Sequence, residues 1–101
     1  MKHSLDGETL TIFLEGELNA YTSETVEKDI KDLLDKTEFT VIVLNMEKLT
    51  YISSAGMRLI VWLKQQYNET SVESVSEPVY RILDMVGFPK MIKIEKLSYE
   101  A

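Results

Sequence analysis

Near the start of the chain, apolar residues recur at every second position. One side of this pattern carries Leu10, Ile12 and Leu14, and the other carries Thr9, Thr11 and Phe13. A period of two predicts a strand with one face buried. Asp6-Gly7, just before it, is typical of a turn, and Gly16, just after it, is typical of a bulge or bend. We therefore expect a strand, or a bent pair of strands, near the edge of a sheet.

The next segment has the spacing of a helix. Its apolar residues recur every three to four positions, at Val26, Ile30, Leu33 and Leu34. This stripe predicts a helix that buries one side, and the charged residues between its members predict solvated faces. Thr22 or Ser23, just ahead of the stripe, is the expected N-cap. Neither is followed, three residues later, by the Glu or Gln that completes a capping box.

A continuous apolar run follows this helix. Val41-Ile42-Val43-Leu44 is short and rich in β-branched residues. It predicts a central strand buried on both faces, as in a sheet that helices cover. Beyond it, residues 55–67 carry a broad apolar surface that includes Met57 and Trp62. We expect a helix there that packs on the sheet and is covered in part by something else. Core packing is the expected role of these two side chains, and contact with a partner is the alternative.

The last third of the chain repeats the alternation of strand and helix. Residues 71–75 predict a short strand, Ser76-Glu77-Pro78 predicts a helix start with a hydroxyl cap, and Gly87 predicts the helix end. The stripe of this helix holds Val79, Ile82, Leu83 and Val86, and a final short strand is expected at Met91, Ile92 and Ile94. The whole pattern predicts an α/β fold, a small mixed sheet of about four to five strands with helices packed on it.

Length and charge narrow the range of functions. The chain has 101 residues, and we expect them to form a single domain, residues 1–101. The net charge of -6 argues against binding nucleic acid or an anionic membrane, which need a basic face, and permits a basic protein partner. No apolar stretch is long enough to cross a membrane, and the first residues lack the apolar core of a signal peptide. We therefore expect a cytoplasmic protein without membrane insertion.

The residue types present exclude several kinds of catalysis. The chain has no cysteine, hence no thiol nucleophile, thiolate metal site or redox pair. The only histidine is His3, close to the terminus, so a nucleophilic serine would have no positioned base. The sequence also has no glycine-rich loop of the kinds that bind nucleotide phosphates. We expect no catalytic residue, no metal and no cofactor.

Two serines precede the second predicted helix. Ser53 and Ser54 lie between a buried strand and this helix, where open α/β sheets carry functional sites. Unpaired N–H groups and the positive end of the helix dipole favour a phosphate there, and Gly56 leaves room for a phosphate or a partner. A serine at a helix start is also an ordinary N-cap, which stabilises by about 1 kcal/mol. These residues alone leave both roles open.

Three stretches together resemble one protein family. They are "GELNAYTS" ahead of the first helix, "ISSAGMRLI" at the serines and "SEPVYRILDMVGF" near the end of the chain. With the buried "VIVLNM" and the order of strands and helices, they resemble the STAS family over nearly the whole chain. This family comprises the anti-sigma factor antagonists and the related cytosolic domains of sulfate transporters. The resemblance implies the STAS fold and says less about role, because one fold serves several systems.

The resemblance to the antagonists implies a phosphorylation cycle. In these proteins an anti-sigma factor that is also a serine kinase phosphorylates the serine before a Ser/Thr/Ala-Gly pair, which corresponds to Ser54, with Ser53 as the second choice. The unphosphorylated antagonist binds the kinase and frees the sigma factor, phosphorylation breaks that binding, and a phosphatase resets the cycle. The implied interface consists of Asn19, Tyr21, Thr22, Ser53, Ser54, Gly56, Met57 and Arg58.

Two residues depart from the family pattern. Well-studied antagonists carry Asp immediately before the acceptor serine, where this chain has Ser53, and frequently carry Asp where it has Asn19. The loss of both carboxylates lowers the local negative charge, which makes a phosphate at Ser54 less costly, and it also alters what a kinase would recognise.

Two other hypotheses compete with the antagonist. Stand-alone STAS proteins also serve as constitutive subunits of transport complexes, including lipid-trafficking ABC transporters, and the serine would then be an unmodified cap. The other hypothesis is a serine hydrolase that uses Ser54, and this lacks a base. We therefore expect a binding protein without enzyme activity.

Overall fold

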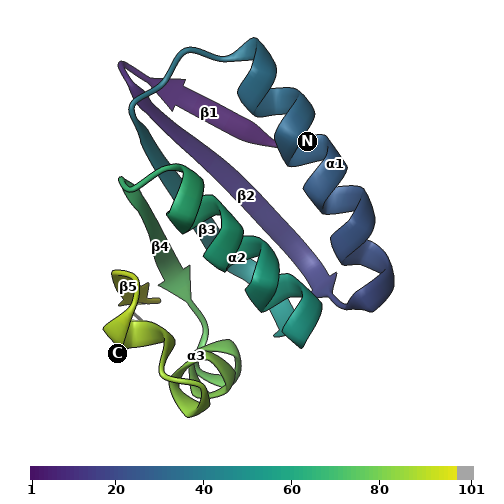
Figure 1. The fold of residues 1–101 in the computed structure, drawn as a ribbon. Helices are drawn as coiled ribbons and strands as arrows, with labels where there is room; N and C mark the ends of the chain where they lie inside the picture. The colour runs from purple at the N-terminus through teal and green to yellow at the C-terminus, as the bar shows by residue number, and fades with distance from the viewer. Residues whose placement is uncertain (98–101) are drawn as a thin grey trace.

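The computed structural model describes residues 1–97, which form a five-stranded sheet with three α-helices against it (Figure 1). This is the small mixed α/β sheet that the sequence predicts. The strands are β1 (His3–Asp6), β2 (Thr9–Leu18), β3 (Val41–Ile52), β4 (Thr70–Val75) and β5 (Ile94–Lys96). The helices are α1 (Ala20–Lys36), α2 (Ser54–Gln66) and α3 (Glu77–Met85), and a short 3₁₀ helix, η1, spans Phe88–Lys90.

The order of the strands in the sheet follows their order in the chain. β1 pairs with β2 in antiparallel fashion, and the other neighbours are all parallel. Parallel connections are right-handed in nearly all proteins, so successive connections in one direction place their helices on the same face. Figure 1 shows α1 and α2 side by side across that face. The chain therefore forms two layers, one of strands and one of helices.

The core lies between these two layers. From the sheet it takes every second residue of β2 and β3: Leu10, Ile12, Leu14, Ile42, Leu44 and Met46. From the helices it takes Ile30, Leu34, Ile60, Leu63, Val79 and Leu83. The predicted period of two in β2 and the predicted helical stripe in α1 are thus confirmed. Met57 and Trp62 are half-buried and pack against this cluster, so they lie at its margin rather than inside it.

Within residues 1–97 no helix lies over the second face of the sheet (Figure 1), so the prediction that the central strand is buried on both faces is wrong. In β3, Ile42 and Leu44 are fully buried, whereas Val41 and Val43, which point to the other face, are only half-buried. The run of apolar residues does not reveal this difference. A valine on an open face packs against the side chains of neighbouring strands, and that packing is enough to favour it there.

The predicted turn and bulge in the first strands are both present. β1 and β2 form a hairpin around Gly7, which has a φ of +61°. At Gly16 φ is +76°, and the pairing of β2 with β3 shifts register on both sides of it. Residues with such φ values are usually glycines, because a Cβ makes the left-handed region costly. The bulge lets β2 continue beside β3 to the last residue of both strands.

The helix α3 ends one residue earlier than its apolar stripe suggests. Ser76 occupies the N-cap position as predicted, without a side-chain hydrogen bond to the helix. Gly87 adopts a φ of +78° and terminates the helix as predicted. Val86 is already the C-cap, so it leaves the stripe and is exposed.

The last strand is shorter than predicted. β5 begins at Ile94, and Met91 and Ile92 belong to the turn that follows η1. The backbone N–H groups of both residues donate to Phe88 O, at 2.9 and 3.1 Å, so they are not free to pair with a strand. Ile92 is buried by this turn and Met91 is exposed.

The uncovered face can be tested with two adjacent substitutions in β3. Leu44 is fully buried, so Leu44→Ala should lower the free energy of unfolding by about 2–5 kcal/mol. Val43 is half-buried, so Val43→Ala should cost about 1 kcal/mol or less. Urea unfolding, followed by the fluorescence of the only tryptophan, Trp62, measures both. Equal losses would contradict a sheet with one open face.

Candidate functional site

The carboxyl ends of β2 and β3 are adjacent, and each leads directly into a helix. The strands stay paired to their last residues, where Leu18 lies opposite Ile52. Ser53 N donates a hydrogen bond to Leu18 O at 2.9 Å. A single residue separates each strand from its helix, Asn19 before α1 and Ser53 before α2. The two helix N-termini therefore lie at the same end of the molecule (Figure 1).

Asn19 is the N-cap of α1. Its Oδ1 accepts hydrogen bonds from the N–H groups of Tyr21 and Thr22 at 2.9 and 3.0 Å, and Thr22 Oγ1 accepts one from the Asn19 N–H at 2.8 Å. This is a capping box with threonine at the third helical position, where Glu or Gln is usual. The prediction of Thr22 or Ser23 as N-cap is therefore wrong, since both lie inside the helix. The sequence does contain a capping signal, Asn-x-x-Thr at Asn19 and Thr22.

The two serines at the start of α2 have different positions. Ser53 is the N-cap, and its Oγ accepts a long hydrogen bond from Gly56 N at 3.4 Å. Ser54 is the first residue of the helix and its side chain is exposed, whereas Ser53 is half-buried. The helix begins within one residue of the predicted start. The capping role thus falls to Ser53, and the hydroxyl of Ser54 is presented at the surface.

Gly56 supports the site from inside. It is buried, and a Cβ built on it would lie 2.8 Å from Ile52 Cγ1 and 2.8 Å from Leu18 Cγ. Real Cβ contacts are essentially never that short. The sequence predicts that Gly56 leaves room for a phosphate or a partner, and this needs correction. The space beside it is filled by the last residues of the two strands, and glycine is required so that α2 can start close to them.

The charges at the start of α2 favour an anion, whereas the groove beside α1 is acidic. Within residues 1–97, neither first turn of α1 or α2 carries an acidic side chain, so the partial positive charge of both N-termini is not neutralised there. Arg58, in the second turn of α2, is exposed. Glu24 and Glu27 of α1 line a groove between the two helices together with Arg58. The basic side of this region is α2 and the acidic side is α1.

Apolar side chains surround Ser54. A shallow groove that includes Ser54 and Arg58 runs between α2 and the segment around η1. Its apolar members are Met57, Val61, Trp62, Val86, Phe88 and Met91, which we call the apolar strip. On the side of α1, Tyr21 is 87% exposed. Phe88 is buried, whereas Val86, Met91 and Tyr21 are exposed. Exposed apolar and aromatic groups beside polar ones are typical of a surface that binds a protein.

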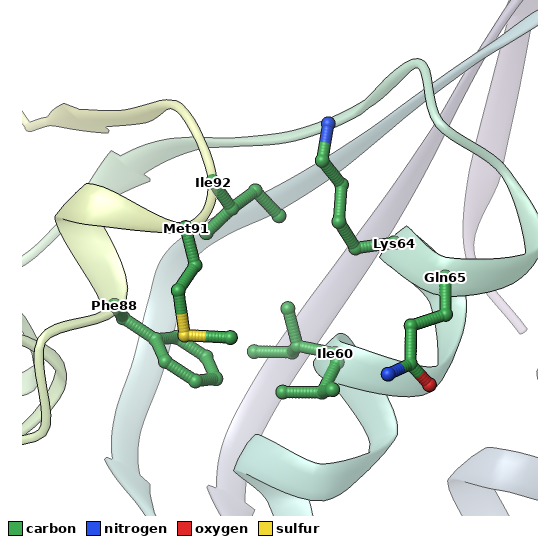
Figure 2. A pocket seen from close by; sticks show the side chains of 7 residues that line it. Ile60, Lys64, Gln65, Phe88, Met91 and Ile92 are labelled. Carbon is green, nitrogen blue, oxygen red and sulfur yellow. The ribbon is translucent and has the colours of Figure 1, made fainter.

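The strip continues into a small pocket between α2 and η1. Figure 2 shows Phe88 and Met91 pointing toward Ile60 of α2, with Lys64 and Gln65 at the rim. The pocket has a volume of about 70 Å³, well below the roughly 300 Å³ of a small-molecule site. Among residues 1–97, no cluster of His, Cys, Asp and Glu is suited to hold a metal. In the same part of the chain, no helix has the length and apolar character to span a membrane.

The structure gathers the predicted site residues at one end of the molecule. Asn19, Tyr21 and Thr22 come from the start of α1, and Ser53, Ser54, Gly56, Met57 and Arg58 come from the start of α2. Asn19, Ser53 and Gly56 build the site, while Tyr21, Ser54 and Arg58 are exposed. Sequence reasoning did not include Val86 and Met91, because their exposure depends on where α3 and η1 end.

Comparison with known proteins agrees with this architecture. A family model described as the STAS domain matches residues 4–101. The chain belongs to the STAS domain family. An STAS relative, the anti-sigma F factor antagonist of Paenibacillus polymyxa, is 32% identical over 89 residues, which are 84% of this chain and 76% of that protein.

Two solved STAS structures share the fold. SpoIIAA, an anti-sigma factor antagonist solved in its unphosphorylated form, has a TM-score of 0.74 at 21% identity, and the match covers 92% of this chain and 85% of that one. The phosphorylated form of SpoIIAA from Bacillus has a TM-score of 0.66 at 20% identity, over 92% of this chain and 88% of that one. At these identities the likeness concerns the fold alone.

The close fit at Gly56 can be tested by adding a methyl group. Gly56→Ala places a Cβ against Leu18 and Ile52, and this overpacking should lower the free energy of unfolding by about 1–3 kcal/mol, despite the higher helix propensity of alanine. Gln66→Ala, at an exposed position of the same helix, is the control and should stay within about 0.5 kcal/mol of the parent. An unchanged or higher stability of Gly56→Ala in urea unfolding would refute the close packing.

Proposed function

We propose that this protein is a cytoplasmic anti-sigma factor antagonist that binds an anti-sigma factor with serine kinase activity, and that phosphorylation of Ser54 breaks the complex. The observation that carries the proposal is the difference between the two serines. Ser53 is held as the N-cap, and Ser54 is exposed as the first residue of α2. The proposal is also supported by the relatives, which are named anti-sigma factor antagonists.

The proposed transfer needs a single group from this chain, the hydroxyl of Ser54. Its Oγ attacks the γ-phosphorus of ATP, an O–P bond forms, the bond to ADP breaks, and the hydroxyl proton passes to a base of the kinase. The kinase binds ATP, so this chain acts as substrate and not as enzyme. The N–H groups and dipole at the start of α2 then stabilise the phosphate by about 0.3–1 kcal/mol.

Ser53 remains the second choice of acceptor, and its geometry disfavours it. Its Oγ accepts from Gly56 N, and a phosphate on that oxygen would disturb a cap that stabilises by about 1 kcal/mol. It is also half-buried. A phosphate on Ser54 displaces no such contact, because the cap does not use its hydroxyl.

The effect of the phosphate is exerted on the docked partner. A phosphoserine carries a charge of about −1.5 to −2 at neutral pH. On Ser54 this charge lies beside the apolar strip. A partner that covers Met57 and Met91 would have to remove water from the phosphate, which costs free energy. The kinase is therefore released, and a phosphatase that removes the phosphate restores binding.

The apolar strip also favours a second candidate, a constitutive subunit of a transport complex. A permanent partner would cover such a strip continuously, and Ser54 would then remain unmodified. The two candidates differ in which partner stays bound to the purified protein and in how ATP affects that binding. The transport subunit binds an ATPase or membrane component regardless of ATP, whereas the antagonist binds a kinase and loses it when ATP is added.

Phosphopeptide mapping tests the acceptor. After incubation with ATP and the cognate anti-sigma factor kinase, intact mass should increase by one phosphate, and the phosphate should map to Ser54. Ser54→Ala should take up none. Ser53→Ala is the matched control and should still be phosphorylated, although the loss of its cap costs about 1 kcal/mol of stability. A phosphate that persists in Ser54→Ala, or that maps to Ser53, would count against the assignment.

Tyr21 allows the docking surface to be tested independently of phosphorylation. Its ring is 87% exposed in the first turn of α1, so Tyr21→Ala should leave the free energy of unfolding within about 0.5 kcal/mol of the parent. Binding of the unphosphorylated protein to the kinase should weaken about tenfold or more, as expected for an aromatic anchor. Leu5→Ala, an exposed apolar residue of β1, is the control and should bind normally. Unchanged affinity in Tyr21→Ala, measured by calorimetry, would place α1 outside the interface.

A further inference from the structure

Arg58 lies one helical turn beyond Ser54 on α2. Residues four apart are neighbours on a helix surface, with about 5–6 Å between their Cβ atoms. Ser54 and Arg58 accordingly line the same groove beside Met57. A phosphate on Ser54 would be N-terminal to the guanidinium, and this is the more favourable order for an ion pair on a helix.

Among residues 1–97, the guanidinium of Arg58 has no ion partner. Glu24 and Glu27 face it from α1 across the groove between the helices, and Glu27 already lies 3.8 Å from Lys31 Nζ. The positive end of the α2 dipole also slightly disfavours a cation this close to the N-terminus. Arg58 is therefore available to an anion placed on its own helix.

We propose that Arg58 binds the phosphate once Ser54 is phosphorylated. This deepens the proposed function and rests on it in one respect, that Ser54 carries the phosphate. The planar guanidinium donates two parallel N–H···O bonds to the phosphate oxygens, a geometry that a lysine ammonium does not offer. Phosphorylation then changes the surface twice: it adds a dianion beside the apolar strip, and it withdraws a cation that the unmodified protein offers to an acidic group of its partner.

The second ionisation of the phosphate measures this pair directly. Phosphoserine is incorporated at position 54 during translation, so the experiment does not depend on a kinase, and ³¹P NMR follows the phosphate through a pH titration at low salt. A cation nearby stabilises the dianion, which holds the second pKa of the phosphate below its ordinary value of about 6. Arg58→Gln should raise that pKa by about 0.3 unit or more, and Arg58→Lys should raise it by less.

Arg81→Gln is the matched control, because Arg81 is an exposed arginine that pairs with Glu77 on α3. It should leave the pKa of the phosphate unchanged. The same pKa in the parent and in Arg58→Gln would overturn the proposal. If Arg58→Gln does shift the pKa, but the kinase fails to phosphorylate Ser54 in the unmodified protein, the ion pair stands and the proposed function fails.

Discussion

The pairing of β2 with β3 up to their last residues positions the candidate site. Because Leu18 lies opposite Ile52, both strands stop at the same level, and one residue leads from each into its helix. Asn19 and Ser53 are those residues, and both are used as caps. The fit leaves no space for a Cβ on Gly56. Because of this register, the exposed residues in the first turns of α1 and α2 lie at the same end of the molecule.

The elements and the fold were predictable from the sequence. Apolar residues repeat every two positions in a strand and every three to four in a helix, and each repeat reflects burial on one side of a single element. The features that escaped prediction depend on contacts between elements. Val43 belongs to an apolar run whether or not a layer covers it. The sequence therefore could not show that one face of the sheet is open. The cap at Asn19 was missed because Thr22 replaces the usual Glu or Gln. The role of Gly56 depends on Leu18, which is distant in the sequence.

The candidate site was predicted as a set of residues, but its division of roles was not. The resemblance to the STAS family pointed to Ser54, while the residues alone favoured a plain cap and left a modification site open as the alternative. The cap geometry separates them, since Ser53 accepts from Gly56 N and Ser54 does not contribute to the cap. A phosphate on Ser54 is then placed on a rigid helix start without replacing an internal contact. The proposed modification would therefore change the surface and leave the interior as it is, with Arg58 as the nearest cation on the same helix.

Phosphorylation of Ser54 is therefore proposed to act on a partner and to leave the fold intact. Urea unfolding of the unmodified protein, compared with that of protein carrying phosphoserine at position 54, tests this proposal. We expect the free energy of unfolding to stay the same or to rise by up to about 1 kcal/mol, because the phosphate lies at the positive end of α2. A loss of about 2 kcal/mol or more would refute the proposal, since the phosphate would then act by loosening the junction of the two strands and helices.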